Sequence, residues 1–115
     1  MVDVGADRFE ELVAEALDGI PSDLGRLMDN VAVFVRDTSG DPHLLGLYEG
    51  IPLTQRETYG VGAAMPDRIT IYRLPILARC RTEAEVVHQV RVTVVHEVGH
   101  HFGISDERLD ELGWG

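Results

Sequence analysis

The sequence predicts a small α/β (α+β) fold with three or so strands, an N-terminal helix on one face of the sheet and a central helix beneath it. Three observations lead to this prediction: an amphipathic repeat over residues 7–20, two strand-like runs at 31–35 and 67–73, and a valine-rich stretch at 83–102 that follows a capping box. With 115 residues the chain is large enough for one hydrophobic core, so we expect a single domain over residues 1–115.

Composition and charge narrow the classes of protein to consider. Apolar residues make up 44% and charged residues 26% of the chain, as in ordinary soluble domains. The net charge of −10 argues against nucleic-acid binding, which needs a basic surface. No apolar run reaches transmembrane length, and the N-terminus lacks the pattern of a secretory signal. The lone Cys80 cannot form an internal disulfide, so we expect a cytoplasmic protein in which Cys80 is a buried small side chain.

The N-terminal helix is predicted at residues 7–20. Asp7 and Glu10 have the spacing of a capping box, and Gly19 with Pro21 would end the helix. A short second helix is expected at residues 22–29. The apolar side chains of the first helix recur at three- and four-residue steps and form a stripe that another element must cover: Phe9, Leu12, Val13, Ala16, Leu17 and Ile20.

The strand predictions rest on composition and alternation. Residues 31–35 are β-branched or aromatic, apart from one alanine, which predicts a buried strand. A turn cluster at 37–42 would lead into a second strand at 44–48, giving a hairpin. Residues 67–73 alternate between apolar and polar side chains, which predicts a half-buried strand.

Two further segments separate these elements from the central helix. Residues 50–66 hold Pro and Gly with few periodic apolar side chains, which predicts a loop. Tyr59 on this loop could reach over a cleft and polarise an oxyanion, although loop tyrosines usually pack locally. Residues 75–80 are predicted to form a short helical turn.

The central helix is predicted at residues 83–102. Its valine content would also suit a strand, but the capping box formed by Thr82 and Glu85 and the length of the segment favour a helix. Gly99 would permit close packing at one point. The valines nearly encircle the helix, so we expect it to be buried at the centre of the fold: Val86, Val87, Val90, Val94, Val95 and Val98.

The pattern His-Glu-x-x-His near the end of this helix carries the functional signal. His96 and His100 are one helical turn apart, so both imidazoles leave the same face and can bind one metal ion. Glu97 is beside that face but off the line between the two histidines. This position suits a residue that handles the proton of an attacking water.

A third ligand requires the chain to turn after His100. Gly103 is suited to such a turn, because glycine adopts the left-handed conformation at little cost, and Asp106 then has the reach to return to the ion. An alternative interpretation stays open, in which Ser105 caps a short helix ending near Leu112 and Asp106 faces its dipole. The remaining histidines are expected to be solvated or to support the site rather than to ligate: His43, His88 and His101.

The motif His96-Glu97-x-x-His100-x-x-Gly103-x-x-Asp106 resembles the extended zinc motif of zincin metallopeptidases, in the variant with Asp as third ligand. The surrounding sequence is similar to short bacterial zincin-like proteins, often called mini-zincins, at DRITIYR (67–73) and HHFGISDERL (100–109).

This resemblance implies a zinc-dependent peptidase acting on a peptide or protein substrate. His96, His100 and Asp106 would bind Zn²⁺, and Glu97 would be the general base. It further implies that the strand at 67–73 is an edge strand that bounds the cleft and pairs with substrate. Zinc itself follows from the resemblance, since two histidines and a carboxylate also suit other transition metals.

Some features depart from the related branches. Metzincins have a methionine turn downstream of the motif, but no Met follows Met65 here. Trp114 is the only large side chain available to lie beneath the site from that side, and an anchoring role is the more ordinary one. Glu107 or Glu111 could replace Asp106, as in gluzincins, although that branch has its Glu farther downstream.

A second function class is a catalytically weak or inactive, metal-dependent binding or regulatory module on the same fold. The missing methionine turn, the short segment after the motif and the absence of a pro-segment favour it. Glu97 favours chemistry instead, because a site that only binds metal does not need a base there.

Overall fold

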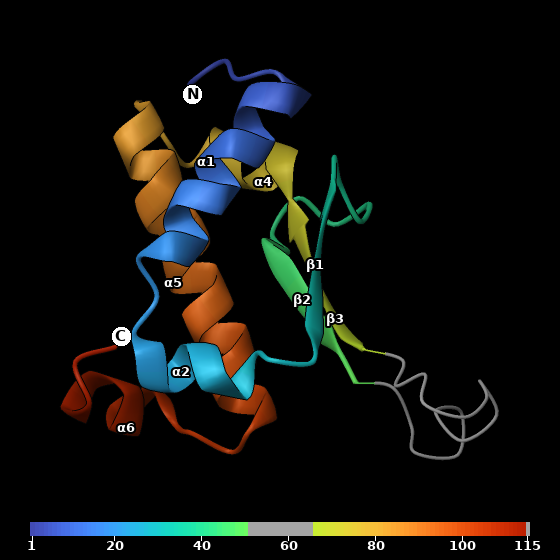
Figure 1. Ribbon diagram of the computed structural model, residues 1–115. Coiled ribbons are helices and arrows are strands. Elements are labelled where there is room, and N and C mark those ends of the chain that lie inside the picture. Colours follow the sequence, from blue (N-terminus) through green and yellow to red (C-terminus); the bar gives the residue numbers. More distant parts are fainter. Residues whose placement is uncertain (51–65, 115) are drawn as a thin grey trace, which may run out of the picture.

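The computed structural model describes residues 1–50 and 66–114 (Figure 1). Within these residues five helices surround one face and the ends of a three-stranded mixed sheet, so the predicted α+β class is confirmed. No helix in the described part is long and apolar enough to cross a membrane. In chain order the elements are α1 (Ala6–Asp18), α2 (Ser22–Leu27), β1 (Val31–Arg36), β2 (Gly46–Glu49), β3 (Asp67–Tyr72), α4 (Arg73–Ala78), α5 (Glu83–His101) and α6 (Asp106–Glu111).

The strand order in the sheet is β1-β3-β2, which differs from the prediction. β3 runs parallel to β1, with Val33 opposite Ile69, and antiparallel to β2, with Tyr48 opposite Ile69. β3 therefore lies between the two strands that were predicted to form a hairpin, and the hairpin prediction is wrong. The connection between β1 and β2, which includes the turn at 37–42, is long enough to cross the end of β3 and reach its other side.

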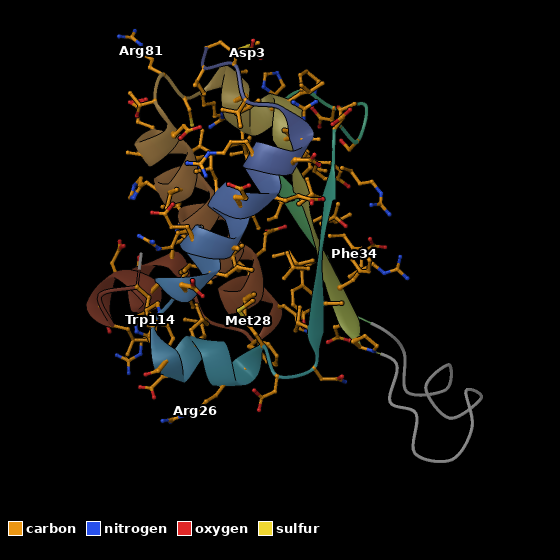
Figure 2. The ribbon with its side chains drawn as sticks, turned by 45° about the horizontal axis from the view of Figure 1, so that its top comes forward. Asp3, Arg26, Met28, Phe34, Arg81 and Trp114 are labelled. Carbon is orange, nitrogen blue, oxygen red and sulfur yellow. The ribbon has the colours of Figure 1, made fainter. Side chains whose placement is uncertain are left out.

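The central place of β3 also changes the predicted burial. Four consecutive residues, from Ile69 to Tyr72, are buried, so side chains on both faces of the strand are shielded from solvent and the strand is not half-buried. The prediction that β3 is an edge strand is wrong for the same reason, because both of its sides are paired. β1 is an edge strand instead and is only partly buried, with Phe34 39% exposed (Figure 2).

The N-terminal helices agree with the sequence apart from one cap. α1 buries Phe9, Leu12, Val13 and Ala16 and packs along α5 (Figure 1), and it ends at Gly19 as predicted. Its N-cap is Gly5, with no side-chain hydrogen bond, so the predicted capping box is wrong. The helix starts at Ala6, which leaves Asp7 inside the first turn, where a carboxylate still faces the positive end of the helix. α2 confirms the predicted second helix.

α5 is the central element of the fold. Thr82 Oγ1 accepts a hydrogen bond from the Glu85 amide at 3.1 Å, and Glu85 Oε2 accepts one from the Thr82 amide at 3.2 Å, which confirms the capping box. All six valines that were predicted to encircle the helix are buried. α5 contacts every other described helix, β2 and β3, so the residues of the motif are attached to a rigid, buried support.

Two smaller predictions have mixed outcomes. α4 begins at Arg73, two residues before the predicted helical turn at 75–80, and Pro75 fits in its first turn because amide groups there have no helical partner. Cys80 is buried as predicted, and burial raises the pKa of its thiol. The predicted loop at 50–66, including Tyr59, lies outside the described residues except for its two ends.

Candidate metal centre

The last turns of α5 bring two imidazoles together, as the spacing predicts. The rings of His96 and His100 are nearly parallel, with an interplanar angle of 21° and 6.0 Å between their centroids. His96 and Glu97 are half-buried, whereas His100 is exposed at the end of the helix. The site therefore opens to solvent on the His100 side and is covered by the fold on the other.

Gly103 turns the chain back after α5. Its φ angle is +78°, and the amides of Gly103 and Ile104 donate hydrogen bonds to the carbonyls of His100 at 3.0 Å and Gly99 at 2.8 Å. This pair of bonds is a Schellman motif, which needs a left-handed residue at the position of Gly103. The turn predicted from the sequence is confirmed.

α6 then returns a carboxylate to the helix face. Ser105 is its N-cap and accepts a hydrogen bond from the Arg108 amide at 3.2 Å. Leu109 is buried against Gly99, where a β-carbon would lie 3.0 Å from Leu109 Cδ2. This close contact docks α6 on α5, and Asp106 Oδ1 lies 2.6 Å from His100 Nε2. The two interpretations of this segment are therefore compatible: Ser105 caps α6, and Asp106 returns to His100.

The donor types of the site fit a zinc ion. Two imidazoles and one carboxylate are ordinary zinc ligands. The 2.6 Å contact of His100 and Asp106 is a hydrogen bond that brings two of these three donors together. Across residues 1–50 and 66–114, no group of three or more His, Cys, Asp or Glu is arranged to hold a metal ion.

One of the two alternative carboxylates and one of the remaining histidines have other surroundings. Glu111 forms an ion pair with Arg108 at 3.0 Å. His88 is exposed and lines a different hollow, which Trp114 also lines. Trp114 donates its amide to the Leu109 carbonyl at 2.9 Å and packs against the core, as expected of an anchor.

An open hollow of about 330 Å³ lies beside the motif. One wall is α5 and another is the chain entering β2. Gly46, the first residue of β2, is so close to α5 that a β-carbon there would lie 2.7 Å from Thr93 Cγ2. The edge strand beside the site is thus β2, not the strand at 67–73. The hollow is lined by Leu44, Leu45, Gly46, Arg79, Gln89, Val92, Thr93, His96 and Glu97.

Comparison with known proteins finds a matching protein family. The family model of zincin-like metallopeptidases matches residues 28–114, which include all three strands, the motif helix and α6. The chain belongs to the zincin-like metallopeptidase family. The matched part of this zincin-like chain begins after α1 and α2.

A solved structure supports the fold of this zincin-like protein. A conserved hypothetical protein from Thermus thermophilus is similar over 95% of this chain and 97% of its own, with a TM-score of 0.52 and 23% identity. At this identity the similarity concerns the fold alone. No curated protein matches the chain.

Sequence reasoning missed a second group of side chains near the zincin-like motif. The His101 ring stacks on Tyr48, with centroids 3.9 Å apart, and the Tyr48 hydroxyl donates to Asp67 Oδ2 at 2.8 Å. His101 Nε2 lies 3.8 Å from the same oxygen. His101 thus joins the end of α5 to β2 and β3. A glycine inside the predicted second strand, Gly46, was the available signal that β2 approaches α5.

Proposed function

We propose that this protein is a zinc-dependent, peptidase-like hydrolase that cleaves a peptide or protein substrate. The observation that carries the proposal is the return of Asp106 to His100, on the helix face that also bears His96. A two-histidine, one-carboxylate set leaves a fourth position for water or substrate, which is the arrangement of catalytic rather than structural zinc sites.

Each residue has a separate role in this proposal. Zinc held by His96, His100 and Asp106 would supply Lewis-acid chemistry, lowering the pKa of water toward about 7 and polarising a carbonyl. Glu97, half-buried at the hollow, accepts the proton of the attacking water and later delivers it to the leaving amine.

β2 takes the substrate-binding role that the resemblance assigned to the strand at 67–73. It lies at the edge of the sheet and borders the hollow that contains Glu97. An extended peptide beside it would be held by backbone hydrogen bonds, with side-chain pockets giving specificity. This arrangement would direct the scissile bond toward His96 and Glu97.

The first test is zinc stoichiometry and affinity, measured by calorimetry on chelator-treated protein. We expect one zinc ion per chain in the wild type and binding weakened by at least about tenfold in Asp106→Ala, which loses one ligand. Asp110→Ala removes an equal charge from the same helix and should leave affinity unchanged. Equal zinc affinity in Asp106→Ala and wild type would exclude Asp106 as a ligand.

The second test is hydrolysis itself. Zinc-loaded protein is incubated with a peptide library, and new termini are detected by mass spectrometry. We expect cleavage that stops when a chelator is added and returns with zinc. The chelator arm separates activity of this site from a contaminating serine or cysteine peptidase.

A metal-dependent binding module is the second candidate. The exposure of His100 and Asp106 to solvent favours it, because an open site does not exclude bulk water from a reaction. Tight zinc binding without cleavage of any library peptide would select this function over hydrolysis.

A further inference from the structure

Among the described residues that line the hollow beside the motif, one is a cation, and its surroundings indicate the chemistry of the ligand. We propose that Arg79 makes this hollow a carboxylate-binding pocket, so that the substrate has an acidic side chain or a terminal carboxylate next to the scissile bond. This inference rests on the proposed function for the position of the bond. The pocket and its charge do not depend on it.

Arg79 differs from most of the described cations in its lack of a partner. All ten basic residues are arginines, in a chain with 20 acidic residues. Within the described residues, Arg79 forms no side-chain hydrogen bond and no ion pair, although it lines the hollow. Four other arginines pair with carboxylates: Arg8, Arg26, Arg73 and Arg108. The positive charge of Arg79 is thus available to a ligand.

The rest of the lining suits the stem and head of an acidic side chain. Leu44, Leu45 and Val92 give apolar surface on which methylene groups pack. The Gln89 side-chain amide donates to Thr93 Oγ1 at 3.4 Å, and Thr93 Oγ1 donates to the Gln89 carbonyl at 2.8 Å. These bonds hold two polar side chains in place beside the apolar surface.

Glu97 shares the pocket and restricts where a carboxylate can bind. Among the described residues, Arg79 and Glu97 form no ion pair with each other, so their opposite charges lie apart in the hollow. A ligand carboxylate is attracted to Arg79, which follows α4, and repelled from Glu97 on α5. The acidic group therefore binds at the Arg79 end and leaves Glu97 and His96 next to the peptide bond.

Binding to zinc-free wild-type protein tests the proposal without hydrolysis. Amide chemical shifts are followed at low ionic strength while acetyl-Ala-Glu-amide or its neutral isostere acetyl-Ala-Gln-amide is added. We expect the Glu peptide to bind about fivefold more tightly, as for one charged hydrogen bond in a partly solvated site. The largest shifts should fall on residues 44–46 and on Gln89 and Val92. Acetyl-Ala-Ala with a free carboxylate distinguishes a terminal from a side-chain group.

Arg81 gives a matched control. It lies two positions from Arg79, has no side-chain partner among the described residues and does not line the pocket. Figure 2 shows Arg81 at the periphery of the molecule. Arg79→Ala should abolish the preference for Glu over Gln, and Arg81→Ala should keep it. Arg79→Glu should reverse it toward acetyl-Ala-Lys-amide.

The outcomes separate the two proposals. Equal binding of the Glu and Gln peptides to wild type, or an equal loss in Arg79→Ala and Arg81→Ala, would overturn the carboxylate pocket. Cleavage of library peptides without any acidic preference would also overturn it while leaving the hydrolase intact. A preference that depends on Arg79, in a protein that cleaves nothing, would uphold the pocket and remove the hydrolase.

Discussion

Gly46 and Thr93 are in closer contact than any side chain at position 46 would permit. A β-carbon there would lie 2.7 Å from Thr93 Cγ2 and 3.2 Å from the Thr70 carbonyl oxygen. Thr93 is β-branched and buried, so it cannot rotate away easily. This contact sets the distance between the edge strand and the motif helix, and with it the width of the hollow beside His96.

Gly46→Ala should therefore destabilise the protein. Overpacking at a buried contact costs about 1–3 kcal/mol of unfolding free energy, which urea denaturation measures. Gly25→Ala is the control, because no atom lies within 4 Å of its added carbon. It sits inside α2, where Ala in place of Gly should stabilise by roughly 0.5–1 kcal/mol. Equal effects of Gly46→Ala and Gly25→Ala on the unfolding free energy would contradict the close contact at Gly46.

Gly103→Ala tests the turn that returns Asp106. The φ angle of +78° costs an L-residue about 1–2 kcal/mol, so both stability and zinc affinity should fall. Gly103→Asn should recover part of the loss, because Asn tolerates this conformation better. Gly40 also has a positive φ, of +99°, in a turn away from the motif. Gly40→Ala should lower stability without changing zinc affinity, and a loss of affinity there would argue against a local effect of Gly103.

Glu97→Gln tests the proposed base. It keeps the size of the side chain and removes its ability to accept a proton, so kcat should fall by about 10²- to 10⁴-fold while the zinc Kd is unchanged. Glu10→Gln, which changes an exposed acidic residue of α1, should keep both activity and zinc. A Glu97→Gln protein as active as the wild type would rule out this mechanism.

Tyr48 tests the attachment of the end of α5 to the sheet. Tyr48→Phe removes the hydrogen bond to Asp67, at a cost of about 1 kcal/mol, and keeps the ring on His101. Tyr48→Ala also removes the stacking and should lower zinc affinity, because the adjacent His100 loses its support. Thermal unfolding and calorimetry measure both effects. Full zinc affinity in Tyr48→Ala would show that this contact does not position His100.

The ion pair between α1 and α5 predicts a pH dependence of stability. The Arg8 guanidinium donates to both Glu83 carboxylate oxygens, at 3.1 and 2.8 Å, and lowers the pKa of Glu83 below its ordinary value of 4.5. The stabilisation is therefore complete above pH 4.5 and is lost as the pH falls through the lowered pKa.

Arg8→Ala should consequently lower Tm slightly at pH 7 and have less effect in acid. Because the pair is exposed, high salt should also reduce the difference. Arg26→Ala breaks a pair within α2 alone and is the control for loss of an exposed arginine. A Tm difference for Arg8→Ala that is the same at pH 7 and pH 3 would contradict the role of Glu83.

The elements of the site that could be predicted are those that depend on near neighbours in the chain. The Thr82 capping box, the shared face of His96 and His100 and the left-handed turn at Gly103 each involve residues within two helical turns. The return of Asp106 also follows from this local geometry, with the Gly99–Leu109 contact docking α6.

The strand order could not be read in the same way. A hairpin of β1 and β2 was expected because sequential strands usually pair, but the parallel pairing of β1 with β3 is a contact between distant residues. Two further predictions for β3 are wrong: the half-buried position inferred from its alternation and the edge position implied by the resemblance both belong to its neighbours.

The sequence by itself determined the motif helix, its caps and the three candidate ligands, because helix geometry fixes the relative positions of residues a few steps apart. Only the tertiary structure decided that β2 borders the site, that Tyr48 supports His101 and that Arg79 lines the hollow. These contacts join residues far apart in the chain, and their pairing depends on how α5 and the whole sheet pack together.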